Sequence, residues 1–542
     1  MTGSFGRGDR PTGNINGTRS PVLARRGVIA TSQPLASAAG LDVLRQGGNA
    51  IDAAVTAAAV LAVVEPTMTG PGGDVFAIVY DARSHTLRGL NSSGRAGSDA
   101  DADALLASGV TGMPSAGGRA VTVPGAVAGW AELLERHGTI TLKTALAPAI
   151  AYAREGFPVA EIVADQWAEA VDVVSDDPAA AAVFLPNGAA PAHGAIFRNP
   201  DLARTLEQIG EEGRDAFYTG RIGAAIVAAV RQRGGFLTGA DLAGHVSNWV
   251  EPIRTSYRGY DVCEMPPNTQ GFVALEMLNI LEGYDIASMG HNSAEYLHLL
   301  VEAKRIAFAD RSAYLADPAH VPQPLLDGLI SKAYAETRRR DIDPRRAAPH
   351  YSQGSFDGRD LGDTVYLAAA DGQGNAISLI NSLFGSFGSG VVAPGTGVVL
   401  HNRGAGFTLQ RNHPNRLAPG KRPLHTLVPG FIMKDGKPLM PFGVMGGDNQ
   451  AQAHAQVVVN LVDFGMNVQD AGDAARVRHG EEGLAVESAI GERVRAALTG
   501  RGHRLIDGRG LMGGYQAVLI DPATGVLMGG SDPRKDGLAI GC

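Results

Sequence analysis

The stretch 362–382 constrains the fold more than any other part of this sequence. It consists of two β-rich runs, T-V-Y-L-A-A-A-D and N-A-I-S-L-I-N-S, joined by G-Q-G. Two such runs joined by a short glycine-containing loop predict a β-hairpin, and a three-residue loop with glycine in the left-handed conformation is a common connection. In that register Asp371 faces Asn375, and Thr364 lies opposite Ser382 at the open end.

The hairpin leaves two interpretations of Thr364 open. In the first, it is one of several polar residues that face water. In the second, the bond between Asp363 and Thr364 is cut, and Thr364 becomes the first residue of a chain. A threonine hydroxyl is a poor nucleophile without a base, and the α-amine of an N-terminal threonine, with a reference pKa of about 7.7–8.0, can act as that base. Ser382 would then orient the Thr364 hydroxyl.

Size and composition exclude several classes of protein. A chain of 542 residues is long enough for two domains or for one large layered domain. Its net charge of −8 argues against a general nucleic-acid binder, which needs a basic face. The two cysteines, Cys263 and Cys542, provide neither a disulfide framework nor a zinc site. We therefore expect no nucleic-acid partner and no structural zinc.

The N-terminal region shows no targeting signal. Residues 1–25 are polar and glycine-rich and lack the apolar stretch of a secretory signal, so we predict a flexible segment. The apolar run 51–64 contains Asp52 and is too short to span a bilayer. These observations predict a cytoplasmic protein with no membrane partner.

Hydrophobic spacing predicts the remaining elements. Helices are expected at 34–45, 49–64, 271–281, 301–314 and 450–464 and over most of 125–250, with strands at 75–80, 391–400 and 439–444. The charged stretch 338–360 is expected to be a solvated surface segment. Helices and strands alternate in blocks, which predicts helices layered on a largely antiparallel sheet.

Short motifs add candidate functional residues. Gly446 and Gly447 lie between a strand and a helix, where two backbone N–H groups could hold an oxyanion; the alternative is a simple turn. Arg95 follows a strand and could bind a carboxylate, or it could be a solvated surface residue. The glycine-rich loop 70–74 precedes a strand and favours a turn over a nucleotide site. No G-x-S-x-G or H-E-x-x-H motif is present, so we expect neither a metal nor a cofactor.

Many short motifs, taken together, resemble the γ-glutamyltranspeptidase family of N-terminal-nucleophile hydrolases. They run from about residue 26 to residue 541 and include G-G-N-A-I-D-A-A-V (47–55), G-P-G-G-D (70–74), S-G-R-A (93–96), A-D-R-S-x-Y-L-x-D-P (309–318), G-D-T-V-Y (362–366), K-R-P-L-H-T (421–426) and M-G-G (445–447). The resemblance implies an α/β fold, a four-layer α/β/β/α sandwich. It also implies a precursor that cuts itself into a large portion, 26–363, and a small portion, 364–542, which form one folded heterodimer. Whether such heterodimers pair further is left open.

The resemblance also implies roles for individual residues. Thr364 matches the nucleophile and Ser382 the supporting hydroxyl. The oxyanion hole corresponds to the glycine pair 446–447. Arg95 matches the arginine that grips the donor's α-carboxylate. His425 and Thr426 occupy the place of two serines that touch the same carboxylate.

The sequence departs from the family pattern around the donor's α-amino group. Phe384 stands where an asparagine is typical, and Arg403 and Gly406 replace a glutamine and an aspartate. An added guanidinium and a missing carboxylate suit a neutral or anionic group better than an ammonium. The segment 407–425 is also short for the lid loop of some members. The N-R-G-A-G-F motif resembles glutaryl-type acylases and oxamate amidohydrolases.

The expected function is therefore an N-terminal threonine amidohydrolase acting on a small-molecule amide. The acyl donor would be a γ-glutamyl compound or a dicarboxylic mono-amide without the α-amino group, and water would accept the acyl group more often than an amine. Two alternatives remain: a binding module that keeps the fold but does not mature, and a nucleotide-dependent enzyme, supported only by glycine-rich loops.

Overall fold

Two seven-stranded antiparallel sheets form the centre of the computed structural model, which describes residues 18–352 and 363–542. The first sheet has the order β1 (Val22–Ala24), β20 (Leu527–Ser531), β19 (Tyr515–Ile520), β15 (Lys437–Val444), β14 (Gly430–Lys434), β9 (Tyr260–Glu264) and β8 (Ile253–Tyr257). The second has the order β21 (Leu538–Gly541), β2 (Gly27–Thr31), β10 (Asp363–Asp371), β11 (Ala376–Phe384), β3 (Asp74–Asp81), β4 (Thr86–Ser92) and β7 (Asn248–Val250). Both sheets therefore combine strands from before and after Thr364.

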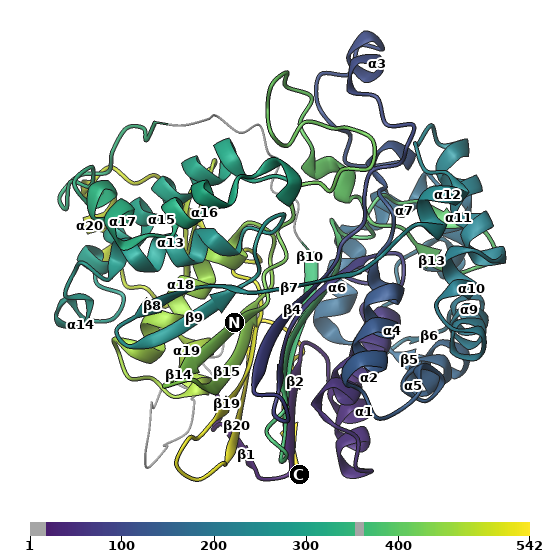
Figure 1. Cartoon of the computed structure of the whole chain (residues 1–542), viewed down its shortest axis with the longest axis horizontal. Helices are drawn as coiled ribbons and strands as arrows, with labels where there is room; N and C mark the ends of the chain where they lie inside the picture. The colour runs from purple at the N-terminus through teal and green to yellow at the C-terminus, as the bar shows by residue number, and fades with distance from the viewer. Residues whose placement is uncertain (1–17, 353–362) are drawn as a thin grey trace, which may run out of the picture.

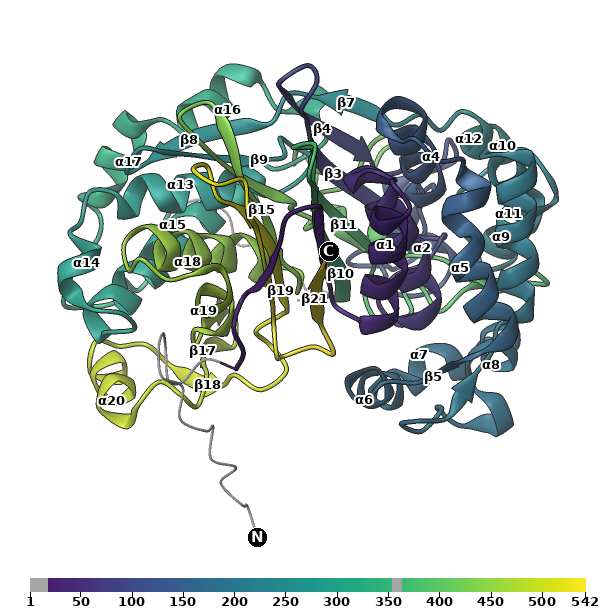
Figure 2. The same cartoon turned by 90° about the horizontal axis from the view of Figure 1, so that it is seen from below.

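Helices cover the outer face of each sheet, so the layers follow the order helix, sheet, sheet, helix (Figures 1 and 2). The first sheet is covered by α13 (Gly271–Leu281), α15 (Ala294–Tyr314), α17 (Lys332–Arg339), α18 (Asn449–Val462) and α19 (Val468–Asp473). The second is covered by α1 (Pro34–Arg45), α2 (Ala50–Val64), α4 (Ala126–His137), α5 (Leu142–Glu155), α9 (Pro200–Glu212) and α11 (Arg221–Gln232). The predicted four-layer α/β/β/α sandwich is confirmed. No helix in the described ranges is long and apolar enough to cross a membrane.

The pleat of β10 determines where Thr364 points. Odd-numbered residues from Val365 to Ala369 pack in the core beneath the helices of the second sheet. Even-numbered residues from Tyr366 to Ala370 pack between the two sheets. Because successive side chains of a strand point to opposite faces, Thr364 faces the first sheet.

The hairpin register agrees with the sequence-based prediction along most of its length. Val365 pairs with Asn381 and Ala370 with Ala376. A bulge between residues 363 and 365 then shifts the ladder, and position 363 lies opposite Phe384. Bulges of this kind are common beside active sites, where they redirect a side chain.

Most predicted helices and strands are present, with three differences. The segment 18–25 is not loose, because β1 pairs with β20 and Thr18 is hydrogen-bonded to Asp473. Helix α15 begins at Ala294, capped by Ser293, instead of at Val301. The stretch 391–400 holds only the short β12 (Val392–Ala393) and β13 (Val398–Val399). Two predictions fall partly outside the described residues. They are the flexible segment 1–25, for its residues 1–17, and the solvated segment 338–360, for its residues 353–360.

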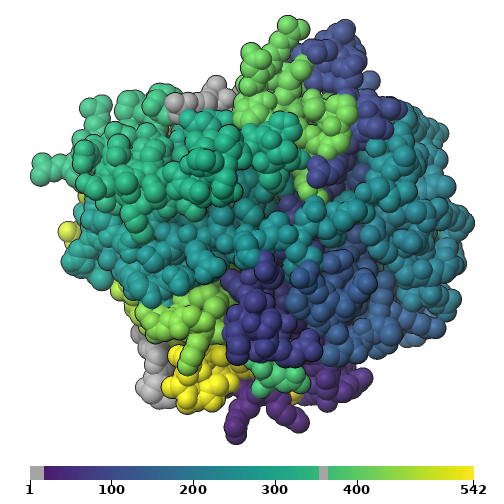
Figure 3. Space-filling view, viewed as in Figure 1, coloured from purple at the N-terminus to yellow at the C-terminus, as the bar shows by residue number. Residues whose placement is uncertain are grey.

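One end of the molecule carries a projection formed by two distant parts of the sequence. Helix α3 (Ala102–Ala107) and the green segment that follows residue 406 rise together above the four layers (Figures 1 and 3). A small apolar cluster joins them and contains Leu105, Phe407 and Leu417. The segment 407–425 is thus a packed part of the structure.

Candidate active site

The hydroxyls of Thr364 and Ser382 lie side by side, as the hairpin register predicts. Thr364 Oγ1 donates a hydrogen bond to Ser382 Oγ at 3.2 Å, and both side chains are buried. They come from adjacent strands of one sheet and share the face that looks toward the other sheet. The rigid centre of the fold therefore determines the spacing of the two hydroxyls.

Two further donors hold the Ser382 hydroxyl in place. Its oxygen accepts a hydrogen bond from the Phe384 N–H at 2.8 Å and another from Arg403 Nη2 at 3.1 Å. Phe384 has φ = 81°, a left-handed conformation that is uncommon for residues other than glycine. In this conformation the Phe384 N–H points at Ser382 Oγ, so a backbone group holds the hydroxyl in position.

Arg403 is buried and connects Ser382 to Thr426. Its Nη1 donates to Thr426 Oγ1 at 3.0 Å, and its Cζ lies 4.1 Å from the centroid of the Phe384 ring. The side chain has no exposed surface. Burial lowers the pKa of Arg403 to about 9, although the charge of Asp74 partly offsets this effect. At neutral pH the guanidinium is therefore still charged, and it links Ser382 to Thr426.

Asp74, at the start of β3, forms a second buried network with His425. His425 Nε2 donates to Asp74 Oδ2 at 3.1 Å, and Asp74 Oδ1 accepts from the N–H groups of Gly94 and Gly125, both at 3.1 Å. Burial, followed by the charge of Arg403, lowers the pKa of His425 to about 3, although Asp74 opposes the shift. His425 is therefore neutral at physiological pH and acts as a hydrogen-bond donor to Asp74.

Gly446 and Gly447 form the turn between β15 and α18. Their φ values are 116° and 55°, in the region that glycine adopts at little cost. Within residues 18–352 and 363–542, neither backbone N–H donates a hydrogen bond to another residue. Two adjacent unengaged donors are a suitable arrangement for an oxyanion.

Side chains from α15 and from the loop before α13 hold this turn. Gln270 Nε2 donates to the carbonyl oxygens of Thr426 and Gly447, at 3.0 and 3.1 Å. Arg311 Nη1 donates to Gln270 Oε1 at 2.6 Å. The guanidinium of Arg311 also forms a bidentate ion pair with the Asp448 carboxylate. Arg311 lies within the motif 309–318, Asp448 directly follows the motif 445–447, and Gln270 directly precedes the helix expected at 271–281, but no sequence pattern marked these three residues as functional.

A cavity of about 1350 Å³ opens beside the hydroxyl pair. Thr364 and Gly446 both contribute to its wall, so the predicted nucleophile and one predicted oxyanion donor face the same space. None of the residues predicted to bind the substrate lines this cavity; they are Arg95, Arg403, His425, Thr426 and Phe384.

Comparison with known proteins assigns the chain to a family. The model of the gamma-glutamyltranspeptidase family matches residues 36–542. The chain belongs to the γ-glutamyltranspeptidase family. A "Glutathione hydrolase-like YwrD proenzyme" of Bacillus subtilis is 39% identical over 96% of this chain and 99% of its own length. An "Acylase ACY 1 proenzyme" of a Pseudomonas species is 38% identical over 96% of this chain and 94% of its own length.

Solved structures agree with this assignment. The crystal structure of a cephalosporin acylase from Bacillus halodurans matches with a TM-score of 0.92 and 42% identity, over 100% of this chain and 99% of that one. The protein is therefore an enzyme of the γ-glutamyltranspeptidase family, with hydrolases and acylases made as proenzymes among its relatives.

Arg95 does not line the cavity beside Thr364. Its side chain is 46% exposed, and Nη1 contacts Asp317 Oδ2 at 3.2 Å and the Gly420 carbonyl oxygen at 2.9 Å. The role of Arg95 in binding a carboxylate stays a prediction.

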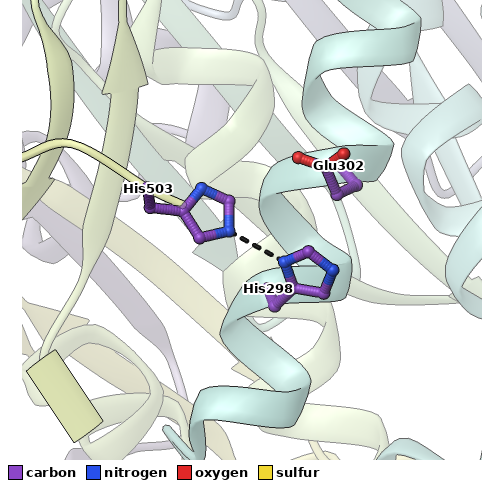
Figure 4. A group of neighbouring side chains, drawn as sticks. All are labelled: His298, Glu302 and His503. Carbon is purple, nitrogen blue, oxygen red and sulfur yellow. Dashed lines mark hydrogen bonds between the residues drawn. The ribbon is translucent and has the colours of Figure 1, made fainter. Parts of the chain in front are cut away.

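The described residues also contain one compact group of potential metal ligands, His298, Glu302 and His503 (Figure 4). His298 Nδ1 lies 2.8 Å from His503 Nε2, and His298 Nε2 lies 2.8 Å from the Asp343 carbonyl oxygen. Two nitrogen ligands of one tetrahedral zinc ion, at about 2.0–2.1 Å each, lie farther apart than this, so the spacing fits a hydrogen bond. His298 and His503 are 205 positions apart in the sequence, so no short motif could have predicted that they meet.

Proposed function

We propose that this protein is a self-processing N-terminal threonine amidohydrolase that forms an acyl-enzyme on Thr364. The single observation that carries the proposal is the hydrogen bond from Thr364 Oγ1 to Ser382 Oγ at the edge of a cavity that Gly446 also lines. Membership of a family with proenzyme relatives supports it.

Maturation would create the base that the reaction needs. In the uncut chain the nitrogen of Thr364 belongs to a peptide bond and cannot accept a proton. Thr364 Oγ1 would add to the carbonyl carbon of residue 363; the C–N bond would break as the nitrogen takes up a proton, and water would hydrolyse the resulting ester. The fragments 1–363 and 364–542 would stay together, because both sheets combine strands from the two fragments.

The same hydroxyl would then act on the substrate. The free α-amine takes the proton from Thr364 Oγ1 as the oxygen adds to the amide carbonyl. The N–H groups of Gly446 and Gly447 stabilise the oxyanion, and the leaving amine departs with the proton from the α-ammonium group. Water, or less often a second amine, then releases the acyl group from Thr364.

The first test is whether the chain cuts itself. Purified protein should give two bands on a denaturing gel, and Edman sequencing of the smaller one should begin at Thr364. Thr364→Ala should remain a single chain and show no amidase activity, because it lacks the nucleophile for both steps. An uncut wild-type chain after prolonged incubation would contradict the proposal and favour a binding module.

The acyl donor that we propose lacks an α-ammonium group, as in a glutaryl amide. Arg403 places a buried positive charge beside Ser382 and Thr426, and both oxygens of Asp74 are already engaged by His425 and backbone N–H groups. An α-ammonium would meet a cation there without a free carboxylate. A γ-glutamyl donor is the second candidate, supported by family membership.

A matched pair of substrates separates the two donors. Glutaryl 4-nitroanilide and γ-glutamyl 4-nitroanilide differ only in the α-amino group. We expect kcat/KM to be at least about tenfold higher for the glutaryl compound, which corresponds to roughly 1.4 kcal/mol of discrimination. A tenfold preference for the γ-glutamyl compound would show that our interpretation of Arg403 is wrong.

A further inference from the structure

Lys304 lines the same cavity as Thr364 and has no carboxylate partner. Its side chain projects from α15 and is only 6% exposed. Its Nζ lies 3.4 Å from His479 Nδ1 and 3.7 Å from the centroid of the Phe308 ring. Across the described part of the chain, no aspartate or glutamate forms an ion pair with it. Buried lysines are rarely left unpaired, so this one points to a ligand.

The charges that act most strongly on Lys304 are mainly positive, although the wall of the large cavity also carries the carboxylates of Asp172, Asp176, Asp177, Glu481 and Glu482. Arg305, Arg311 and Arg478 also line the cavity, and their charges act on Lys304. The charge of Asp448 opposes theirs, but Arg311 already holds both oxygens of Asp448. Burial, followed by the charge of Arg311, lowers the pKa of Lys304 to about 7. An anion bound here would supply the missing counter-charge and keep the lysine protonated.

The position of Lys304 indicates which half of the substrate it would meet. The residues predicted to hold the acyl group do not line this cavity, whereas Lys304 does. Asp448, whose charge acts on Lys304, directly follows Gly447. Thr364, Gly446 and Lys304 therefore line one cavity, to whose wall Arg403 and His425 do not contribute.

We propose that Lys304 is the centre of a subsite that binds a carboxylate on the amine half of the substrate. This inference rests on the proposed amidohydrolase function. Preferred substrates would be amides whose leaving amine carries a carboxylate, and Lys304 would determine this specificity without taking part in bond cleavage. A charge-assisted hydrogen bond to a largely buried lysine is strong enough to discriminate by about tenfold or more.

The test compares two leaving amines that share one acyl group. With the acyl group that the enzyme accepts, the 3-carboxy-4-nitroanilide should have a kcat/KM about tenfold above that of the 4-nitroanilide. Lys304→Met should remove this preference. Lys535→Met is the matched control, because Lys535 lines the same cavity but is half-buried, and it should keep the preference. Equal values for the two anilides in the wild type, or an unchanged ratio in Lys304→Met, would overturn the proposal.

Binding to an inactive variant separates this inference from the proposed function. Thr364→Ala should bind 5-amino-2-nitrobenzoate, the carboxylated leaving amine, about tenfold more tightly than 4-nitroaniline in a calorimetric titration. The additional Lys304→Met change should abolish the difference. Above about pH 7 the difference should shrink as Lys304 loses its proton. If the difference is present but wild-type protein cleaves no amide, the subsite stands and the proposed function fails; if it is absent, the subsite is wrong.

Discussion

At the scale of single residues, the two hydroxyls at the end of the hairpin depend on groups that hold them still. Ser382 Oγ accepts hydrogen bonds from the Phe384 N–H and from Arg403 Nη2, and it also accepts one from Thr364 Oγ1. The two nitrogen donors fix the position of the Ser382 oxygen, and the Thr364 hydroxyl points at that oxygen. Oγ1 of Thr364 is thereby oriented before any substrate arrives, which is the condition for efficient nucleophilic catalysis.

Removing the Ser382 hydroxyl should therefore slow both maturation and turnover. We expect Ser382→Ala to lower the rate of chain cleavage and kcat by about 10–100-fold, the effect of losing a hydrogen bond worth roughly 1.5–3 kcal/mol. Ser382→Thr should recover most of the rate, because it restores a hydroxyl at the same atom. Time courses on denaturing gels measure the first rate and anilide hydrolysis the second.

Ser378→Ala is the control for this prediction. Ser378 lies on the same strand and face, and its hydroxyl bonds to the Tyr366 hydroxyl at 2.7 Å, away from Thr364. Both alanine variants leave buried polar groups without a partner and should lose similar stability. If Ser378→Ala slowed cleavage as much as Ser382→Ala, general loss of stability would explain the effect, and the orienting role would be wrong.

At the scale of secondary-structure elements, local pattern predicted some elements well and others poorly. The β10–β11 hairpin follows from strict spacing around a glycine loop, so its register could be derived down to Val365. Helix α15 was predicted seven residues too short at its N-terminus, because its first two turns mix polar and apolar residues that are almost all buried. Only contact with neighbouring elements makes those turns helical, which local periodicity does not show.

The same helix connects the two ends of the candidate site. Lys304 and Arg311 are seven residues apart and therefore lie on one face of α15. Arg311 holds Gln270 and Asp448 around the glycine turn, whereas Lys304 reaches the cavity beyond it. A single rigid element thus fixes the distance between the predicted oxyanion hole and the proposed anion subsite.

At the scale of the whole molecule, the four layers bury several histidines that carry no charge. Burial lowers the pKa of His245 to about 4 and that of His425 to about 3, against about 6.5 in an unfolded chain. Between those values the unfolded chain binds protons that the folded protein does not. The stability that these two neutral histidines contribute is therefore complete above about pH 6.5, and it is lost progressively as the pH falls toward 4.

This linkage predicts a clear pH dependence of unfolding. Each of these histidines should lower the free energy of unfolding by up to about 1.4 kcal/mol per pH unit between pH 6 and 4.5. Urea unfolding midpoints measured across that range provide the test. His245→Gln should flatten the curve, and the exposed His320→Gln should leave its slope unchanged. An identical slope in His245→Gln and the wild type would contradict the assignment.

The sequence by itself determined the hairpin, the blocks of helix and strand, and the motifs that identify the family. These features depend on neighbours within a few residues, or on many short matches spread along the chain. Tertiary structure decided what no local pattern could show: that Arg403 is buried behind Ser382, that Arg95 lies outside the cavity, and that Lys304 shares that cavity with Thr364. Such relations depend on how distant strands and helices pack, because packing alone sets which side chains meet and which charges remain unpaired.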